Sequence, residues 1–206
     1  MRKFEKVLAI GSHPDDIEIG CGGTIAKWAK SGAEIYFMVM TFGESGGEAA
    51  IRKQEQEDAS KILGIKKLYW GDYPDANFIL DNTLITDIEK VIFEMSPDVV
   101  FVHYHKDTHQ DHRILSTATI TASRYTSNVL FYEGPSSYEF SPVVFVDISS
   151  HIIKKFDSLY AHTSQVNKTN IKGLNIAEIA EANAIFRGTE GRVKYAEAFV
   201  PFRFFV

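Results

Sequence analysis

Short apolar runs alternate with amphipathic segments along the whole chain. Apolar runs of about four to eight residues, such as the one within Asp98–His103, are typical of strands buried on both faces of a sheet. The strands predicted from such runs are Lys6–Ser12, Glu34–Thr41, Lys67–Trp70, Asp98–His103, Val129–Tyr132, Val143–Ile148 and Ala196–Phe205. The helices predicted between them are Gly20–Lys30, Arg52–Leu63, a segment from Asp81 through Glu94, a segment from Thr108 to about Arg124, Ile152–His162 and Ile176–Phe186. This alternation predicts an α/β fold, with a mostly parallel sheet, helices on both faces and right-handed crossovers.

Local signals mark where several of these segments begin or end. Gly64 stands where the helix over Arg52–Leu63 would stop, since glycine readily takes left-handed backbone angles. Asp81 is a candidate N-cap, and Ser96-Pro97 ends the following helix, because the residue before a proline avoids helical angles. The chain contains no Gly/Ser linker, charge block or repeat of about 20 to 50 residues. We therefore expect a single domain over residues 1–206.

The composition narrows the class of partner. The chain has 206 residues, of which 45% are hydrophobic and 24% charged, and 27 acidic against 22 basic residues give a net charge of −5. This acidic net charge does not indicate the basic surface with which proteins bind nucleic acid or an anionic membrane. We therefore expect a small-molecule partner. The apolar runs are far shorter than a bilayer span, and the first residues lack the apolar core of a signal peptide. We therefore expect no membrane insertion and a cytoplasmic location.

Cys21 is the only cysteine in the sequence. It excludes a disulfide within the chain and a cysteine-rich zinc cluster, so a metal would be held by histidine and carboxylate side chains. The surrounding stretch, Gly20–Gly23, lacks the spacing of a phosphate-binding turn. We interpret its glycines as sites of close helix packing and Cys21 as a small buried side chain.

Two polar clusters directly follow predicted strands. Gly11–Asp16 comes after the first strand, and His103–Arg113 comes after the strand that ends near His103. Parallel α/β sheets bind ligands outside the carboxyl ends of their strands, and the fold would bring both clusters together there. The clusters contain five of the seven histidines, a density that suggests a function.

These residue types suit hydrolysis at zinc. A catalytic zinc takes three nitrogen or oxygen ligands and leaves a position for water, while a nearby carboxylate accepts a proton from that water. His13 and Asp16, with one histidine of the second cluster, supply such ligands. Because Asp15 and Asp16 are adjacent, one can bind the metal while the other transfers protons. His109 and His112 are spaced to share a helix face, so one can bind metal while the other faces the substrate.

Plainer roles compete for some of these residues. An acidic loop before a helix is often a cap, which would account for Asp15 alone. Capping does not explain the two clusters together, because it requires neither the histidines nor their place at two strand ends. His103 and His105 can also be satisfied polar groups that face a cleft. Glu44, in the glycine-containing loop Thr41–Gly47, is either a solvated acid or part of a mobile rim over the site.

Three motifs together resemble the LmbE-like, or PIG-L, deacetylase family. They are His13-Pro-Asp-Asp16, Gly22-Gly23 and His109-x-Asp-His112. Further segments are similar to the family's second loop, its second helix and its C-terminal part: Thr41–Glu44, Arg52–Gly64, His162–Gln165 and Tyr195–Phe199. The resemblance implies a Rossmann-like fold and zinc-dependent removal of acetyl groups from substrates that contain N-acetylglucosamine. The products would be acetate and a free amino sugar.

The resemblance also implies a role for each site residue. The zinc ligands would be His13, Asp16 and His112. Asp15 would be the general base and later proton carrier. His109 would stabilise or protonate the tetrahedral intermediate, and Asp111 would orient His109.

Two further residues are expected at the substrate. Arg52 resembles a family arginine near the sugar or its anionic substituent, and a guanidinium can bind a carboxylate or phosphate in bidentate fashion. As a cation on the surface of a helix, Arg52 would equally need no explanation. Glu44, from the second loop, is the other candidate for substrate binding.

The first motif departs from the family at one position. Many members have glutamate directly after His-Pro-Asp-Asp, whereas here Ile17 follows and Glu18 comes one residue later. The Ile-Glu version resembles the subgroup that deacetylates N-acetylglucosaminyl malate in bacillithiol synthesis. It therefore makes that conjugate a candidate substrate.

Several alternatives stay open at this level. A lipid-, nucleotide- or oligosaccharide-linked amino sugar is the alternative substrate for an enzyme. A non-catalytic, metal-containing domain that binds a sugar or nucleotide is the alternative outside enzymes. The aromatic-rich segment Phe199–Val206 fits either a buried last strand or a contact in a homo-oligomer.

Overall fold

The strands form one seven-stranded sheet in the order β3-β2-β1-β4-β5-β7-β6 in the computed structural model, which describes residues 4–205. The strands are β1 (Lys6–Gly11), β2 (Glu34–Val39), β3 (Lys67–Trp70), β4 (Val99–His103), β5 (Asn128–Tyr132), β6 (Val144–Asp147) and β7 (Ala196–Arg203). The helices are α1 (Asp16–Lys30), α2 (Ala49–Leu63), α3 (Asn82–Met95), α4 (Gln110–Ala122), α5 (Ile152–Tyr160) and α6 (Ile176–Gly191).

The direction of the strands defines the class of fold. The strands β3-β2-β1-β4-β5 are parallel to their neighbours, whereas β7 is antiparallel to both β5 and β6. The chain passes from β1 to β2 and β3 on one side and then crosses to β4 and β5 on the other. This arrangement is Rossmann-like and confirms the predicted α/β fold with a mostly parallel sheet.

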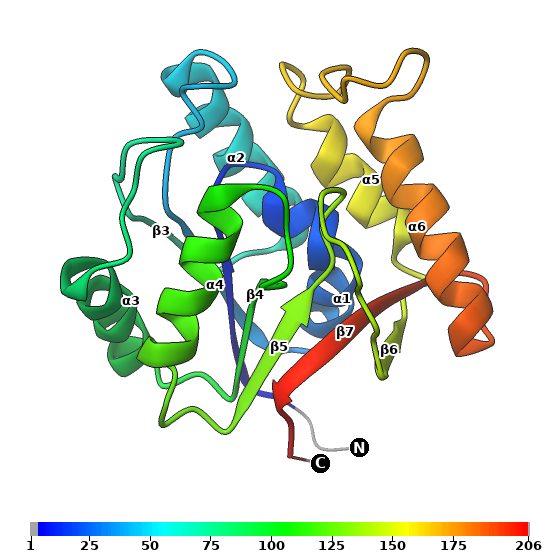
Figure 1. The fold of residues 1–206 in the computed structure, drawn as a ribbon. Helices are drawn as coiled ribbons and strands as arrows, with labels where there is room; N and C mark the ends of the chain where they lie inside the picture. Colours follow the sequence, from blue (N-terminus) through cyan, green and yellow to red (C-terminus); the bar gives the residue numbers. More distant parts are fainter. Residues whose placement is uncertain (1–3, 206) are drawn as a thin grey trace.

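Alternate strand residues fill two cores, one on each face of the sheet. In β1, Val7 and Ala9 lie in the core that α1 and α2 cover, while Leu8 and Ile10 lie in the core that α3 and α4 cover. All four side chains are fully buried, as expected for a strand covered on both faces. α5 packs against α1 and α2, and α6 packs against β6 and β7. Figure 1 shows α3 and α4 in front of the sheet and α1 behind it.

Local sequence signals explain two helix ends. The Asp81 carboxylate accepts a backbone N–H of the first turn of α3 at 2.9 Å, so Asp81 is the N-cap. Gly64 follows α2 with φ 75°, the left-handed conformation in which glycine ends helices. α6 runs to Gly191 rather than to the predicted Phe186. It can continue because Gly188 lets the helix pass close to the backbone that precedes β7.

α1 begins at Asp16, earlier than the predicted start at Gly20. The helix continues through Gly20–Gly23 except at Cys21, whose backbone angles (φ −147°, ψ 16°) are not helical and produce a kink. A Cβ on Gly20 would lie 2.1 Å from the Tyr132 ring, so only glycine fits there. This contact confirms close packing as the reason for glycine at that position, and Cys21 is buried as predicted.

A buried ion pair replaces the helix hydrogen bonds that the kink interrupts. The Glu197 carboxylate accepts the backbone N–H groups of Gly23 at 2.9 Å and Thr24 at 2.7 Å. The Lys155 ammonium donates to the carbonyl of Ile19 at 2.6 Å and to Glu197 at 2.5 Å. Because both side chains are less than 5% exposed, each charge depends on the other. The pair therefore fastens α1 to α5 and to the last strand.

The aromatic C-terminal segment is divided between core and surface. Phe199 is fully buried in β7, whereas Phe202 and Phe205 are exposed. Val206 lies outside the described residues. The segment is thus a strand through Arg203, whereas Phe204 and Phe205 lie beyond its end, and a contact in a homo-oligomer stays a prediction. Among residues 4–205, no helix has the length and apolar character needed to cross a membrane.

Candidate metal centre and active site

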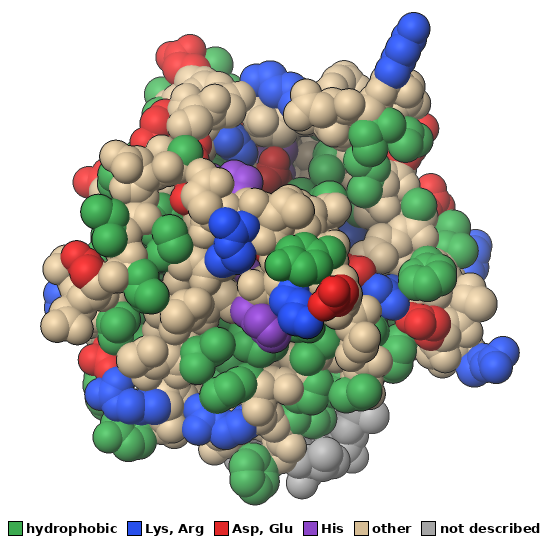
Figure 2. Space-filling model, viewed as in Figure 1, with side chains coloured by type: hydrophobic (Ala, Val, Ile, Leu, Met, Phe, Trp, Pro, Cys, Tyr) green, Lys and Arg blue, Asp and Glu red, His purple; other side chains and the backbone are tan. Residues whose placement is uncertain are grey.

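The two polar clusters meet at the carboxyl ends of β1 and β4. These strands are neighbours, and the strand order reverses between them. One connection leads from β1 into α1 and the other from β4 into α4; in Figure 1 this edge of the sheet is at the top. Figure 2 shows a hollow in the surface there, with histidine and charged side chains at its bottom. Open α/β sheets bind ligands at such a reversal point.

Asp16 lies between two histidines from different elements. Its carboxylate oxygens are 3.3 Å from Nδ1 of His13 and 3.4 Å from Nε2 of His112. Asp16 also accepts the backbone N–H of His13 at 2.7 Å, which fixes the carboxylate at the start of α1. All three side chains are at most 10% exposed. The structure thus brings together the three residues predicted to bind metal, and their ligation stays a prediction.

The opposite ring nitrogens of both histidines face carboxylates. Nε2 of His13 is 3.2 Å from Asp111 and 3.0 Å from Asp75. Nδ1 of His112 is 3.2 Å from Asp107, although the pair does not have the geometry of a hydrogen bond. Histidines that bind metal through one nitrogen commonly donate the other N–H to a carboxylate, which fixes the ring and its tautomer. This pattern favours the two histidines as ligands and the three carboxylates as groups that orient them.

The pKa values reveal a strong negative field at this point. Burial alone would lower the pKa of His13, but hydrogen bonds to its carboxylate neighbours outweigh burial and raise the pKa well above its usual value. Burial acts in the same direction on His112, yet Asp16 and Asp107 raise its pKa to about 9. The surrounding carboxylates therefore favour positive charge at the two rings. A divalent cation bound here would supply that positive charge in place of the protons.

The donor set also fits a metal in its chemistry. It consists of imidazole nitrogens and carboxylate oxygens, which are the ligands that catalytic zinc takes in the absence of thiolates. In addition, Oδ1 of Asp111 is buried and has no hydrogen-bond partner among the described residues. A buried carboxylate oxygen of this kind needs a partner. The residues of this edge therefore fit a divalent ion such as zinc.

His103 and His109 extend the group of donor atoms. Ligand atoms of His13, His109 and His112 lie within 4.8 Å of one another, as do those of Asp16, His103 and His112. Nε2 of His103 accepts the backbone N–H of Ser12 at 3.1 Å, and its ring stacks on His112 with centroids 3.8 Å apart. Burial, with His112 adjacent, lowers the pKa of His103 to about 4, so its ring stays neutral.

His105 behaves differently from the other histidines of its cluster. Its side chain is exposed, and its ring packs against Phe131. It belongs to none of the close donor groups in the part of the chain that the structure describes. Its position therefore sets it apart from the candidate metal centre.

Asp15 has an unusual backbone conformation at the start of α1. Its φ of 91° is in the left-handed region, which costs a non-glycine residue about 1–3 kcal/mol. Although Asp15 is the N-cap residue, its side chain makes no capping hydrogen bond, so capping does not account for it. The Gln56 side chain accepts the backbone N–H of Asp15 at 3.1 Å and donates to Glu18 at 2.7 Å. Burial raises the pKa of Asp15 to about 6, against the opposing effects of His162 and Arg52.

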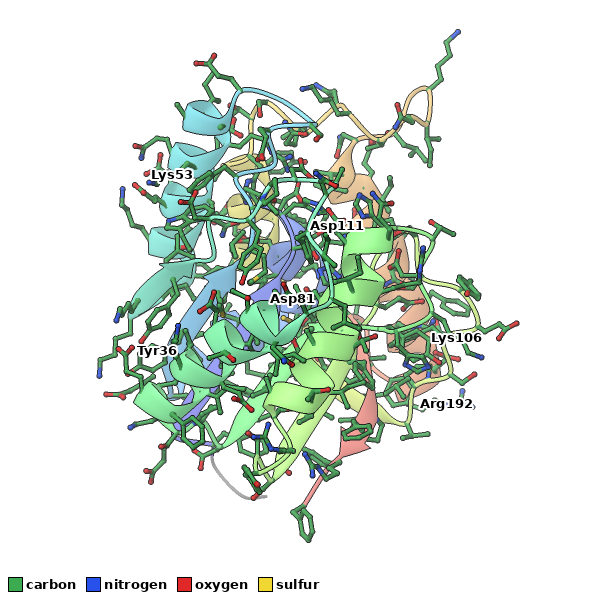
Figure 3. All side chains as sticks on the ribbon, turned by 60° about the vertical axis from the view of Figure 1, so that its left-hand side comes forward. Tyr36, Lys53, Asp81, Lys106, Asp111 and Arg192 are labelled. Atoms are coloured by element: carbon green, nitrogen blue, oxygen red, sulfur yellow. The ribbon has the colours of Figure 1, made fainter. Side chains whose placement is uncertain are left out.

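His109 is the N-cap residue of α4, and its ring stacks on His112 with centroids 4.6 Å apart. Nδ1 of His109 accepts the backbone N–H of Asp111 at 3.3 Å, so the neutral ring carries its proton on Nε2. Burial, with His112 and His13 nearby, lowers the pKa of His109. The Asp111 carboxylate instead faces His13 and accepts the backbone N–H of Ala76 at 2.8 Å. Asp111, labelled at the start of α4 in Figure 3, thus contacts His109 through its backbone N–H, and its role in orienting His109 stays a prediction.

Arg52 is only 5% exposed, so it is not a cation on the helix surface. Its guanidinium donates to the carbonyls of Gly43 and Pro14, both at 2.8 Å, and lies 3.6 Å from the Asp15 carboxylate. It therefore joins the loop after β2 to the loop after β1. Glu44 is exposed in the loop after β2, where it accepts the backbone N–H of Asp75 at 2.8 Å. Substrate contacts of Arg52 and Glu44 stay predictions.

Three residues of the site had no assigned role in the sequence. Asp107 stands inside the second cluster, but spacing does not show which acid faces His112. Asp75 comes from the loop after β3, and Gln56 from α2. The one sequence signal for Gln56 is its place one turn after Arg52, on the same face of the helix.

Comparison with known proteins identifies the family. A family model described as "PIG-L: GlcNAc-PI de-N-acetylase" matches residues 8–123. "Uncharacterized deacetylase YaiS" of Escherichia coli (strain K12) is 37% identical over 171 residues, which cover 79% of this chain and 92% of that protein. "Probable N-acetyl-alpha-D-glucosaminyl L-malate deacetylase 2" of Bacillus anthracis is 28% identical over 188 residues, covering 80% of this chain and 83% of that protein.

Solved structures agree with these relatives. The structure of N,N'-diacetylchitobiose deacetylase from Pyrococcus horikoshii, in complex with an inhibitor, is similar with a TM-score of 0.86 and 28% identity. The match covers 97% of this chain and 84% of that chain. The chain belongs to the PIG-L family, as its motifs predict, and it is an enzyme of the deacetylase class.

Proposed function

We propose that this protein is a zinc-dependent hydrolase that removes the N-acetyl group from a small molecule containing N-acetylglucosamine. The observation that carries the proposal is the position of Asp16 between facing nitrogens of His13 and His112, while the other nitrogen of each ring faces a carboxylate. Membership of the PIG-L family makes removal of an acetyl group the reaction that this arrangement best supports.

We assign His13, Asp16 and His112 as the zinc ligands. Zinc bound there supplies positive charge that polarises the acetyl carbonyl and acidifies water. The chain's own residues hold the ligand set in place: carboxylates face the outer ring nitrogens, and His103 packs behind His112.

Asp15 is the general base of the proposed reaction. Its carboxylate accepts a proton from water as the water oxygen bonds to the amide carbon. It then returns that proton to the amine nitrogen as the C–N bond breaks, so that acetate and a free amine result. A pKa of about 6 suits both steps, because the group is ionised at neutral pH yet holds a proton long enough to transfer it.

His109 stabilises the negative oxygen that develops on the amide carbon. The hydrogen bond at Nδ1 leaves the proton on Nε2, from which the ring can donate to that oxygen. One preorganised donor of this kind contributes about 3 kcal/mol to the rate. The stacked contact with His112 holds the ring beside the metal ligands.

Acetate release and metal content test the proposal together. Purified protein should carry about one zinc per chain and release acetate from at least one conjugate of N-acetylglucosamine with malate, inositol, a nucleotide or another sugar. Asp15→Asn should keep zinc and lose at least about a hundredfold in kcat. His112→Ala should lose both zinc and activity. Full activity in Asp15→Asn, or full zinc occupancy in His112→Ala, would contradict the assignment.

The same panel decides the group attached to the sugar. The Ile17-Glu18 motif and the Bacillus relative favour the malate conjugate, whereas the Pyrococcus structure is that of a deacetylase named for a disaccharide. Binding without turnover across the whole panel would instead support a non-catalytic, metal-containing binding domain.

A further inference from the structure

A groove of about 840 Å³ opens beside the active site. It is lined on one side by Gly46, in the loop after β2, and on the other by the segment 165–175 between α5 and α6. Small-molecule sites have volumes of about 300–1,000 Å³, so the groove can hold part of a ligand. In Figure 1 these two segments rise to the top of the molecule, one light blue and the other yellow to orange.

One guanidinium separates the groove from the proposed catalytic base. A Cβ on Gly46 would lie 2.9 Å from Nη1 of Arg52, so the wall of the groove touches that side chain. Nη2 of the same guanidinium is 3.6 Å from the Asp15 carboxylate. A substrate whose amide reaches Asp15 can therefore extend past this guanidinium towards the groove.

Hydrogen bonds within the chain hold the walls of the groove in place. Glu55, buried in α2, accepts the backbone N–H and the hydroxyl of Ser164, both at 2.7 Å. The Lys168 ammonium reaches across and donates to the carbonyl of Gly46 at 2.7 Å. At the other end, Asn175 starts α6 with a capping box. Because these contacts exist within the protein itself, a ligand would meet a preformed surface.

The side chains that line the groove favour hydroxyl groups. Asn167 and Asn170 are exposed amides, and an amide offers both a donor and an acceptor, which matches neighbouring hydroxyls of a sugar. Ile171 and Leu174 are 52% and 43% exposed and offer apolar surface to the C–H face of a ring. The described residues that line the groove include no aromatic side chain on which a nucleobase would stack.

The side chains that line the groove carry one excess positive charge. Lys168 and Lys172 line it together with Glu178, and the Lys168 ammonium already has the carbonyl of Gly46 as a partner. A dicarboxylate such as malate would therefore find little excess positive charge there.

We infer that this groove is a second subsite, which binds a neutral, hydroxyl-rich ring attached to the N-acetylated sugar. The inference rests on the proposed function and narrows it: the substrate class is an oligosaccharide-type conjugate, in which a further sugar ring occupies the groove.

Substrate comparison with groove variants tests the inference. Zinc-loaded protein is assayed with N-acetylglucosamine, with the β-linked disaccharide of two such rings, and with the malate conjugate. The test variant is Asn167→Ala/Asn170→Gly, in which glycine suits the φ of 58° at residue 170. Gln54→Ala, which removes an exposed amide of α2 outside the groove, is the matched control.

We expect the wild type to prefer the disaccharide to both other substrates. The double variant should lose at least about fivefold in kcat/KM for the disaccharide, because two hydrogen bonds are removed, and should keep its rate with the monosaccharide. The control should match the wild type. Equal losses for both sugars, no loss for the disaccharide, or faster turnover of the malate conjugate would overturn the inference.

Failure of the proposed function is detected separately. If no substrate releases acetate, the proposed reaction fails, and the subsite is tested by NMR titration with the β-linked disaccharide of glucosamine. Binding to the wild type that weakens in the double variant but not in Gln54→Ala supports the subsite. No binding to the wild type overturns it.

Discussion

Replacing Gln56 by leucine should slow catalysis while leaving the metal site intact. Gln56 is fully buried; its Oε1 accepts the backbone N–H of Asp15 at 3.1 Å, and its Nε2 donates to Glu18 at 2.7 Å. Leucine has a similar volume, so Gln56→Leu removes both hydrogen bonds without opening a cavity. Asp15 would then keep its left-handed φ of 91° with its N–H unbonded.

The expected size of the effect follows from these contacts. The left-handed conformation of Asp15 costs about 1–3 kcal/mol, and a buried donor left unpaired costs about 1–3 kcal/mol more. Together these costs favour relaxation of the Asp15 backbone, which moves the carboxylate away from its position. Since a displacement of about 1 Å can reduce a rate about a hundredfold, kcat of Gln56→Leu should fall by a factor on the order of 30 to 100. The free energy of unfolding should fall by about 2–4 kcal/mol.

Steady-state kinetics of acetate release, with zinc measured on the same samples, provide the assay. KM and zinc content should stay within about twofold of the wild type, because Gln56 touches none of the proposed ligands. Gln54→Leu, on the exposed face of the same helix, is the control and should behave as wild type. A kcat of Gln56→Leu within about threefold of wild type would refute the reasoning, as would a loss of zinc in proportion to activity.

Three further predictions concern packing and ionisation. Gly20→Ala should destabilise the protein by about 3 kcal/mol, because the new Cβ would lie 2.1 Å from an aromatic ring of β5. Gly22→Ala is the control and should be close to neutral, because its Cβ would have its nearest neighbour at 3.6 Å. Similar urea midpoints for the two variants would contradict this prediction. Burial raises the pKa of the Cys21 thiol, so a thiol reagent at neutral pH should label it only after unfolding, and fast labelling of native protein would count against its burial. Burial lowers the pKa of His162, but nearby carboxylates, Glu18 foremost, outweigh burial and raise this pKa above its unfolded value of about 6.5. The protonated ring therefore contributes fully to stability below about pH 6.5, and this contribution is lost as the pH rises through the folded pKa. The difference in unfolding free energy between wild type and His162→Gln should therefore shrink from about pH 6 to about pH 9, and a difference that grows with pH would exclude this sign.

Local physical chemistry explains why most of the fold could be predicted. Gly64 and Asp81 act within one turn of the helices that they bound, so their roles are visible in the sequence. The sequence predicts too late a start for α1, because the glycines of Gly20–Gly23 oppose a helix when only neighbouring residues are considered. Glu197 and Lys155, far along the chain, restore the hydrogen bonds that make this helix possible. The sequence also does not predict that β7 is antiparallel to its neighbours, because side chains alternate between the two faces in the same way in parallel and antiparallel strands.

The candidate site, like the fold, could be predicted only in part from the sequence. Residue types at two strand ends suffice to predict that His13 and Asp16 meet a histidine of the second cluster, since parallel strands place their carboxyl ends at one edge. The choice of His112 rests on the resemblance to the family. The carboxylates that face the outer ring nitrogens come partly from elsewhere: Asp75 reaches His13 from the loop after β3. Such contacts decide which ring nitrogen of each histidine faces Asp16. The spacing of residues along the sequence does not show these contacts.

The ion pair behind the kink of α1 has a consequence for the order in which the enzyme is assembled. Glu197 lies 174 residues after Gly23, whose N–H it accepts, so the first helix and the last strand complete each other. All three proposed zinc ligands lie within residues 8–123, the segment that the family model matches. A nascent chain that has just exposed this segment nevertheless lacks the carboxylate that accepts the N–H groups of Gly23 and Thr24, beyond the kink in the helix that carries Asp16. The helix that carries Asp16 should therefore be complete only after the last strand has entered the sheet.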